Sequence, residues 1–101
     1  MDYSDATEMT PKLFNCGYKQ LIFNGVLYRE DNYIVAHCLQ LDIVGTSPNS
    51  EIEAIDKLLE LIEVSVIHAL ETNDLVHLFK AAPRQYWDMA LTAQKEKPDA
   101  N

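Results

Sequence analysis

The chain contains few glycines, prolines, cysteines and basic residues for its length. Its 101 residues include 3 Gly, 4 Pro and 2 Cys, while 48% of the residues are apolar. This composition excludes a disordered or collagen-like chain and predicts a single folded domain. Two cysteines are too few for the disulfide framework of a small secreted domain. We therefore expect a reduced, cytoplasmic protein.

Basic residues are outnumbered by acidic ones. The chain has 8 Lys and Arg against 16 Asp and Glu, which gives a net charge of -8. A field of this sign repels phosphate, so it argues against nucleic acid or an anionic membrane as the partner and suits a basic protein. The sequence also lacks an apolar run of the ~20 residues that a membrane span needs. The first nine residues have no apolar signal core, so nothing predicts export.

The histidines and cysteines do not form a metal-binding pattern. His37 and Cys38 are neighbours on an expected strand, so their side chains point to opposite faces and cannot share a ligand. His68 and His77 have no ligand spacing to Cys16. We interpret Cys38 as a buried core thiol and expect no metal.

Catalytic and cofactor motifs are also missing. The glycines are isolated, so no loop can cradle a phosphate. Asp31, Asp42 and Glu63 fall on a turn, a bend and a helix, and no spacing brings them together as paired carboxylates. We interpret them as separate surface acids and expect a non-enzymatic protein without a cofactor.

The hydrophobic pattern predicts an α+β domain over residues 19–94, between a flexible N-terminal segment at 1–18 and a polar tail at 95–101. Its expected elements are strands at 19–28, 33–39 and 43–46, a long helix at 50–70, a fourth strand at 75–79 and a short helix at 84–94. The first three strands form an antiparallel meander, and the long helix covers one face of it. The order is therefore β-β-β-α-β-α.

Pairing Tyr28 with Tyr33 across a four-residue turn sorts the strand residues onto two faces. Gly25 and Ala36 make one face low in the middle, which suits the long helix. A single helix leaves the other face bare in a monomer, and an exposed apolar patch of this kind usually marks an interface. The candidate interface residues on this face are Ile22, Val26, Tyr28, Tyr33, Val35, His37 and Leu39.

The long helix begins with a capping box, in which Ser50 accepts from the Glu53 amide and the Glu53 carboxylate reaches back to Ser50. Its expected core stripe is Ile52, Ile55, Leu59, Ile62, Val66, Ala69 and Leu70. Leu61 and Val64 point away from that stripe and need a second cover. Either the C-terminal segment, with Trp87, or another protein chain could provide this cover. Leu61, Val64 and Trp87 therefore complete the list of candidate interface residues.

The run from Asn32 to Ile62 resembles the HicB family of antitoxin domains. Members show a Tyr-rich apolar strand, a short turn, a glycine and a Thr/Ser-x-x-Glu-Ala helix start. The matching residues are Tyr33, Ala36, Leu39, Leu41, Asp42, Gly45, Ser50, Glu53, Ala54 and Leu58. Residues 39–42 replace the Pro-rich turn that is common in the family.

The resemblance implies a partial ribonuclease-H-like fold with three antiparallel strands, a long helix and a further strand. It also implies a dimer or larger homo-oligomer that binds and blocks HicA, a small basic RNA-cleaving toxin. Many members add a C-terminal DNA-binding module. The segment after Asp74 is too short for a helix-turn-helix, so we expect no direct nucleic-acid binding here.

Two other functions stay open. A small-molecule-binding or hydrolytic domain would use a pocket around His37, close to Asn24 and Tyr28. A stand-alone regulatory or structural oligomer would have the same fold and no toxin partner.

Overall fold

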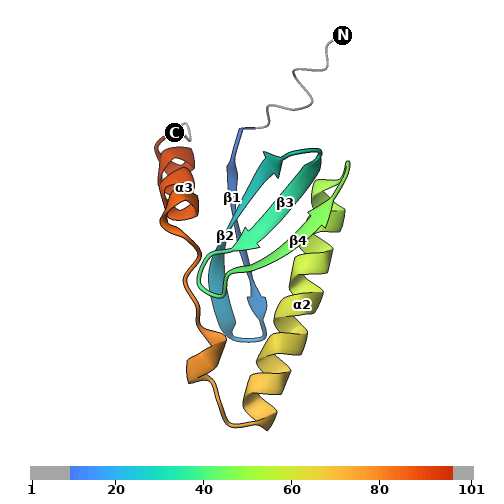
Figure 1. The fold of residues 1–101 in the computed structure, drawn as a ribbon, viewed down its shortest axis with the longest axis vertical. Helices are drawn as coiled ribbons and strands as arrows, with labels where there is room; N and C mark the ends of the chain where they lie inside the picture. The colour runs from blue at the N-terminus through green and yellow to red at the C-terminus, as the bar shows by residue number, and fades with distance from the viewer. Residues whose placement is uncertain (1–9, 97–101) are drawn as a thin grey trace.

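The computed structural model describes residues 10–96, which form an α+β domain with a four-stranded sheet and two α-helices. The strands are β1 (Lys12–Tyr18), β2 (Leu21–Glu30), β3 (Tyr33–Cys38) and β4 (Ile43–Ser47). They are followed by α2 (Glu51–Glu71), the short 3₁₀ helix η1 (Val76–Leu78) and α3 (Arg84–Glu96). The sheet is an antiparallel meander in the order β1-β2-β3-β4. The two α-helices lie on opposite sides of it (Figure 1).

Two predicted elements differ from the structure. Residues 12–18 pair with β2 as a strand, so the boundary of the flexible segment at residue 18 was wrong. The predicted strand at 75–79 is also wrong, because η1 occupies this stretch and Val76 and Phe79 are exposed. The expectations for residues 1–9 and 97–101 lie outside the described range.

The β2–β3 hairpin is tighter than predicted. Glu30 pairs with Tyr33, which leaves a two-residue turn in which Asp31 has a φ of 57°. Tyr28 therefore pairs with Val35, and the predicted pairing with Tyr33 was wrong by two residues. Because side chains alternate with a period of two, this shift leaves each residue on its predicted face.

Helix α2 begins at the predicted cap, with a different arrangement of side chains. The Glu53 amide donates to the Ser50 hydroxyl at 3.0 Å, as a capping serine requires. The Glu53 carboxylate does not reach back to Ser50. It accepts from the hydroxyl of buried Ser47, and the same hydroxyl accepts from the Ser50 amide at 3.0 Å. Ser47 thus ties the end of β4 to the start of α2.

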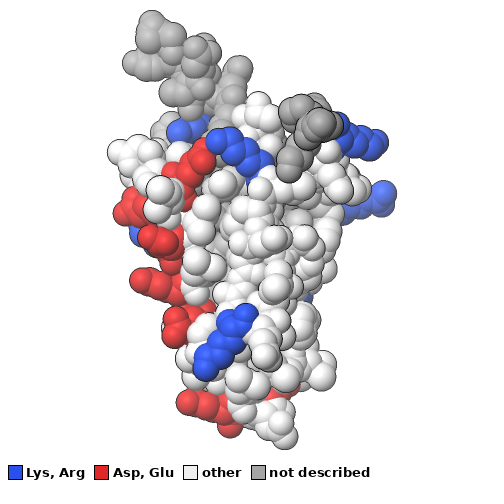
Figure 2. Space-filling view, turned by 180° about the vertical axis from the view of Figure 1, so that it is seen from behind, with Lys and Arg blue, Asp and Glu red and all other residues white. Residues whose placement is uncertain are grey.

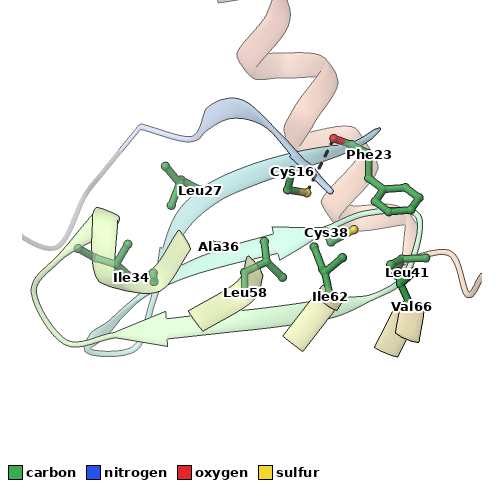
Figure 3. Close-up of a cluster of buried hydrophobic side chains, with 11 residues drawn as sticks. Cys16, Phe23, Leu27, Ile34, Ala36, Cys38, Leu41, Leu58, Ile62 and Val66 are labelled. Carbon is green, nitrogen blue, oxygen red and sulfur yellow. Dashed lines mark hydrogen bonds between the residues drawn. The ribbon is translucent and has the colours of Figure 1, made fainter. Parts of the chain in front are cut away.

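The main core lies between α2 and one sheet face. Figure 3 shows Leu58 and Ile62 of α2 pointing toward Ala36 and Cys38 of β3, and Val66 lying beside Leu41. The buried residues of α2 are Ala54, Leu58, Ile62, Val66 and Ala69, whereas Ile52 and Leu70 of the predicted stripe are exposed.

Strand β4 and helix α2 approach each other closely at Gly45. A Cβ added at Gly45 would lie 2.3 Å from the Ala54 carbonyl oxygen and 2.4 Å from the Leu58 nitrogen. Only glycine lets the two backbones meet at this distance.

Helix α3 builds a second core on the other face of the sheet. This core contains Val26, Val35 and Leu39, with Tyr86 and Trp87 packed against them. The connection to α3 is fixed by backbone hydrogen bonds from residues 80 and 82 to the carbonyls of residues 40 and 39, at 3.0 and 2.8 Å. The Trp87 indole also donates to the Ala82 carbonyl at 3.0 Å. The chain therefore covers its own second sheet face.

Charge is distributed unevenly over the surface. In Figure 2, acidic side chains form a column along the side of the molecule where α2 lies, and most of the remaining surface in this view is uncharged. The acidic residues on the exposed side of α2 are Glu53, Asp56, Glu60, Glu63 and Glu71. Neither described helix has the length and apolar character to cross a membrane.

Candidate functional site

The structure separates the predicted interface residues into a buried set and an exposed set. Five of them, which we expected to be bare in a monomer, are at most 6% exposed because α3 covers them: Val26, Tyr28, Val35, His37 and Leu39. The expectation of exposure was wrong for these five. Ile22, Tyr33, Leu61 and Val64 are exposed, and Trp87 is half-buried on α3. Leu61 and Val64 lie on α2, far from the face that α3 covers.

His37 is the centre of a buried hydrogen-bonded chain. Its Nδ1 atom lies 2.8 Å from the Tyr28 hydroxyl, and its Nε2 atom lies 2.8 Å from Asp42 Oδ1. A carboxylate can only accept, so Nε2 carries the donated proton. With neutral imidazole, Nδ1 is then the acceptor and the Tyr28 hydroxyl is the donor. The chain thus runs from phenol through imidazole to carboxylate.

This arrangement has the components of a catalytic triad, but the phenol is not activated. Burial, followed by the influence of Tyr86, raises the pKa of Tyr28 above its ordinary value. A nucleophile needs the opposite shift, toward easier deprotonation. The raised pKa therefore argues against nucleophilic attack by Tyr28.

Tyr86 of α3 completes an aromatic cluster around His37. Its ring stacks on Tyr28 with centroids 5.3 Å apart and lies 4.6 Å from the His37 ring. The rings of Tyr28 and His37 are 6.0 Å apart. Tyr86 lies in the first turn of α3, which begins directly after Pro83. The docking of α3 on the sheet therefore sets the position of the Tyr86 ring.

An open groove of about 410 Å³ lies beside this cluster. It is lined by Tyr28, Glu30, Asp31, Tyr33, Val35, His37, Asp42, Val44, Thr46, Pro83 and Tyr86. Its volume falls within the range of roughly 300–1,000 Å³ that is usual for ligand sites. Three lining residues are acidic, and none of the described lining residues is Lys or Arg. The groove is therefore aromatic and negatively charged.

Sequence reasoning found part of this groove and missed the rest. It selected Tyr28, Tyr33, Val35 and His37, which are among the lining residues. It treated Asp42 as an unrelated surface acid. A left-handed turn residue brings Asp42 to His37, since Asp42 has a φ of 55° and its amide donates to the Cys38 carbonyl at 2.9 Å. Asp is one of the few residues besides Gly that readily adopt the left-handed conformation. Its presence between two strands was therefore the sequence signal for this turn.

Asn24, which was grouped with His37 from the sequence, lies outside the groove. Its backbone amide donates to the Gln40 side-chain oxygen at 2.9 Å, and its side-chain oxygen accepts from Gln40 Nε2 at 2.8 Å. These bonds prolong the β2–β3 pairing beyond the end of β3. Asn24 therefore has a structural role here.

The two cysteines meet in the core on the α2 side of the sheet. Both are free and buried, as predicted for Cys38. A hydrogen bond with Cys38, together with burial, raises the pKa of the Cys16 thiol. The Cys16 thiol also donates to the Phe23 carbonyl at 3.8 Å (Figure 3). The hydrogen bond with Cys16 lowers the pKa of the Cys38 thiol, but both side chains are buried, so neither thiol is an accessible nucleophile.

The described part of the chain contains no group of three or more His, Cys, Asp or Glu side chains placed to hold a metal ion. No family model, curated protein or solved structure matches this chain.

Proposed function

We propose that this chain is a non-catalytic module that binds a small basic protein, in the manner of a HicB-type antitoxin. The observation that carries this proposal is the groove beside His37, whose described lining combines three carboxylates with three tyrosines and includes no Lys or Arg. The net charge of -8 adds a long-range attraction for a basic partner.

The order of elements from β2 to α2 supports the HicB comparison. Three antiparallel strands are followed by a long helix with Ser50 as its N-cap, which is the order that the resemblance implies. Strand β1 is additional to that pattern. The further strand expected after the helix is replaced among the described residues by η1 and α3. The proposal is therefore for a divergent, stand-alone domain of this type.

The proposal is tested with the genes on either side of the coding sequence. We expect one of them to encode a short basic protein that cleaves RNA by itself. Adding an equimolar amount of this chain should stop the cleavage, and the affinity should weaken between about 50 mM and about 300 mM salt. A basic neighbour whose cleavage continues unchanged, or the lack of such a neighbour, contradicts the proposal.

Self-association forms part of the same proposal. Leu61 and Val64 are 46% and 64% exposed on α2, and α3 packs on the opposite sheet face and does not cover them. An exposed apolar pair on a long helix suits contact with a second copy. Light scattering should give a mass of at least two chains, and Leu61→Ser with Val64→Ser should lower it. A monomer at micromolar concentration contradicts this part.

The rival function is binding of a small molecule in the same groove. The aromatic walls of the groove favour this alternative, because rings and a few polar groups are typical of such sites. Hydrolysis in this groove is less well supported than simple binding, because the raised pKa of Tyr28 makes its hydroxyl harder to deprotonate. A screen of neutral and charged small molecules by thermal shift separates the rival from protein binding.

A further inference from the structure

The groove beside His37 has a charge pattern that selects a cation. Glu30 and Asp31 are exposed at the β2–β3 turn, and Asp42 contributes a third carboxylate from the opposite end of β3. His37 uses only Oδ1 of Asp42, so the second oxygen of that carboxylate can accept another hydrogen bond. An anionic or neutral ligand would leave these acids without compensation.

The aromatic walls indicate an organic cation in preference to a metal ion. Tyr86 is held by its stacking on Tyr28, while Tyr33 is 49% exposed and lines the groove from the start of β3. Tyrosine faces attract organic cations within about 6 Å of the ring. The described acids of the groove do not form a three-ligand cluster for a metal.

A guanidinium group matches these walls better than an ammonium group. It is planar, so it can lie on a tyrosine ring while its edge donates to carboxylates. We propose that the groove receives an arginine side chain of the basic partner, with the guanidinium between the Tyr33 ring and the carboxylates of Glu30 and Asp31. This inference rests on the proposed function, because it assigns the site at which that partner is held.

A small arginine probe tests the site without the partner. Acetyl-arginine amide is titrated into the ¹⁵N-labelled full chain, and acetyl-citrulline amide, which has the same length but no charge, is the matched control. We expect saturable shifts of the amide signals of Asp31, Tyr33 and Thr46 with the arginine probe, at the end of the groove beside the β2–β3 turn. Equal shifts with both probes, or shifts spread along α2, overturn the proposal.

Three variants then locate the contacts. Tyr33→Leu removes the exposed ring, and the double change Glu30→Gln with Asp31→Asn removes two charges while keeping a residue that tolerates the φ of 57° at the turn. Each should weaken arginine-probe binding roughly two- to fivefold, as expected for exposed cation–π and carboxylate contacts. Asp56→Asn, on the acidic side of α2, removes a charge away from the groove and should leave binding unchanged. Circular dichroism confirms that each variant folds.

The same variants separate failure of this inference from failure of the proposed function. If the basic partner binds the wild type tightly and binds the Tyr33→Leu and Glu30→Gln/Asp31→Asn variants equally well, the groove proposal is overturned and the proposed function stands. If the arginine probe occupies the groove but no basic partner protein binds, the proposed function fails and the groove proposal stands as a site for a smaller cation.

Discussion

The Nε2 atom of His37 lies 2.8 Å from Oδ1 of Asp42, across the turn that ends β3. The His37 side chain is 4% exposed and that of Asp42 is 23% exposed, so the pair links the second core to the open groove. Tyr28 binds the other imidazole nitrogen and stacks on Tyr86 of α3. His37 of β3 therefore connects the turn at Asp42, strand β2 through Tyr28, and helix α3 through Tyr86.

Replacing Asp42 with Asn should destabilise the fold through this pair. Asn keeps the left-handed backbone conformation, so the change removes the charge without straining the turn. The Asn side-chain oxygen can still accept from His37 Nε2, so only the charged part of the hydrogen bond is lost, and we expect the free energy of unfolding to fall by about 1 kcal/mol. Urea unfolding followed by circular dichroism measures it. Asp56→Asn on exposed α2 is the control, and an equal loss in both variants would contradict the role of the pair.

Tyr28→Phe should change how stability depends on pH. Because the folded-state pKa of Tyr28 is raised, the phenol contributes stability below its ordinary value of about 10 and loses that contribution as pH rises beyond it. The variant should be less stable than the wild type by about 0.5–1.5 kcal/mol at neutral pH. The difference should stay constant below about pH 10 and shrink as the pH rises above it, toward the raised pKa of the folded state. Parallel curves for the two proteins would argue that Tyr28 does not titrate in this way.

Two glycine substitutions should differ in severity. Gly45→Ala places a Cβ 2.3 Å from the Ala54 carbonyl oxygen, and neither backbone can move aside without shifting α2. Gly25→Ala meets the ring of Phe14 at 2.5 Å, and that half-buried side chain can rotate. We expect a loss of about 3 kcal/mol or more for Gly45→Ala and a smaller loss for Gly25→Ala. Thermal and urea unfolding test this order, and the reverse order would contradict the close approach of β4 to α2.

Alanine substitutions at two predicted interface residues should separate core from surface. Leu39 is 1% exposed beneath α3, whereas Ile22 is 72% exposed. Leu39→Ala should lower the free energy of unfolding by about 2–5 kcal/mol, the range for buried leucines. Ile22→Ala should change it by about 0.5 kcal/mol or less. A mild effect at Leu39 would mean that α3 does not cover this face in solution.

The two thiols should not form an intramolecular disulfide. Cys16 is on β1 and Cys38 is on β3, with β2 between them. Strands in a sheet lie about 4.8 Å apart, and Cys16 and Cys38 pair with β2 residues two positions apart, Phe23 and Gly25. The two Cα atoms are therefore separated by more than roughly 9 Å, beyond the reach of a disulfide. Mass spectrometry after treatment with oxidised glutathione should recover both thiols in the folded monomer. A loss of two mass units from that species would contradict this separation.

Much of the fold could be predicted because its signals are local or periodic. Ser50 marks the helix start through its own hydrogen bond, and the two faces of the β2–β3 hairpin survive a shift of two residues. The unpredicted strand β1 lacks such a signal. Its sequence KLFNCGY mixes polar and apolar residues on both faces, and its pairing with β2 decides its structure.

The candidate site was harder to predict, because it depends on contacts between distant segments. His37 was selected from its place on an apolar strand, but its partner Asp42 arrives through a left-handed turn that spacing alone does not reveal. Tyr86 reaches His37 only because α3 docks on the second face. Residues 75–79 show the opposite case, in which an apolar run resembles a strand but stays largely exposed.

The placement of α2 and α3 on opposite faces limits how the sheet could take part in a larger assembly. Both broad surfaces are occupied, so the main-chain groups left open among the described strands are those along the outer margins of β1 and β4. A second copy that extended the sheet would have to align sideways at one margin and continue the ladder of hydrogen bonds. Joining at β4 would place Val44 and Thr46, and with them the groove, at the seam between the copies.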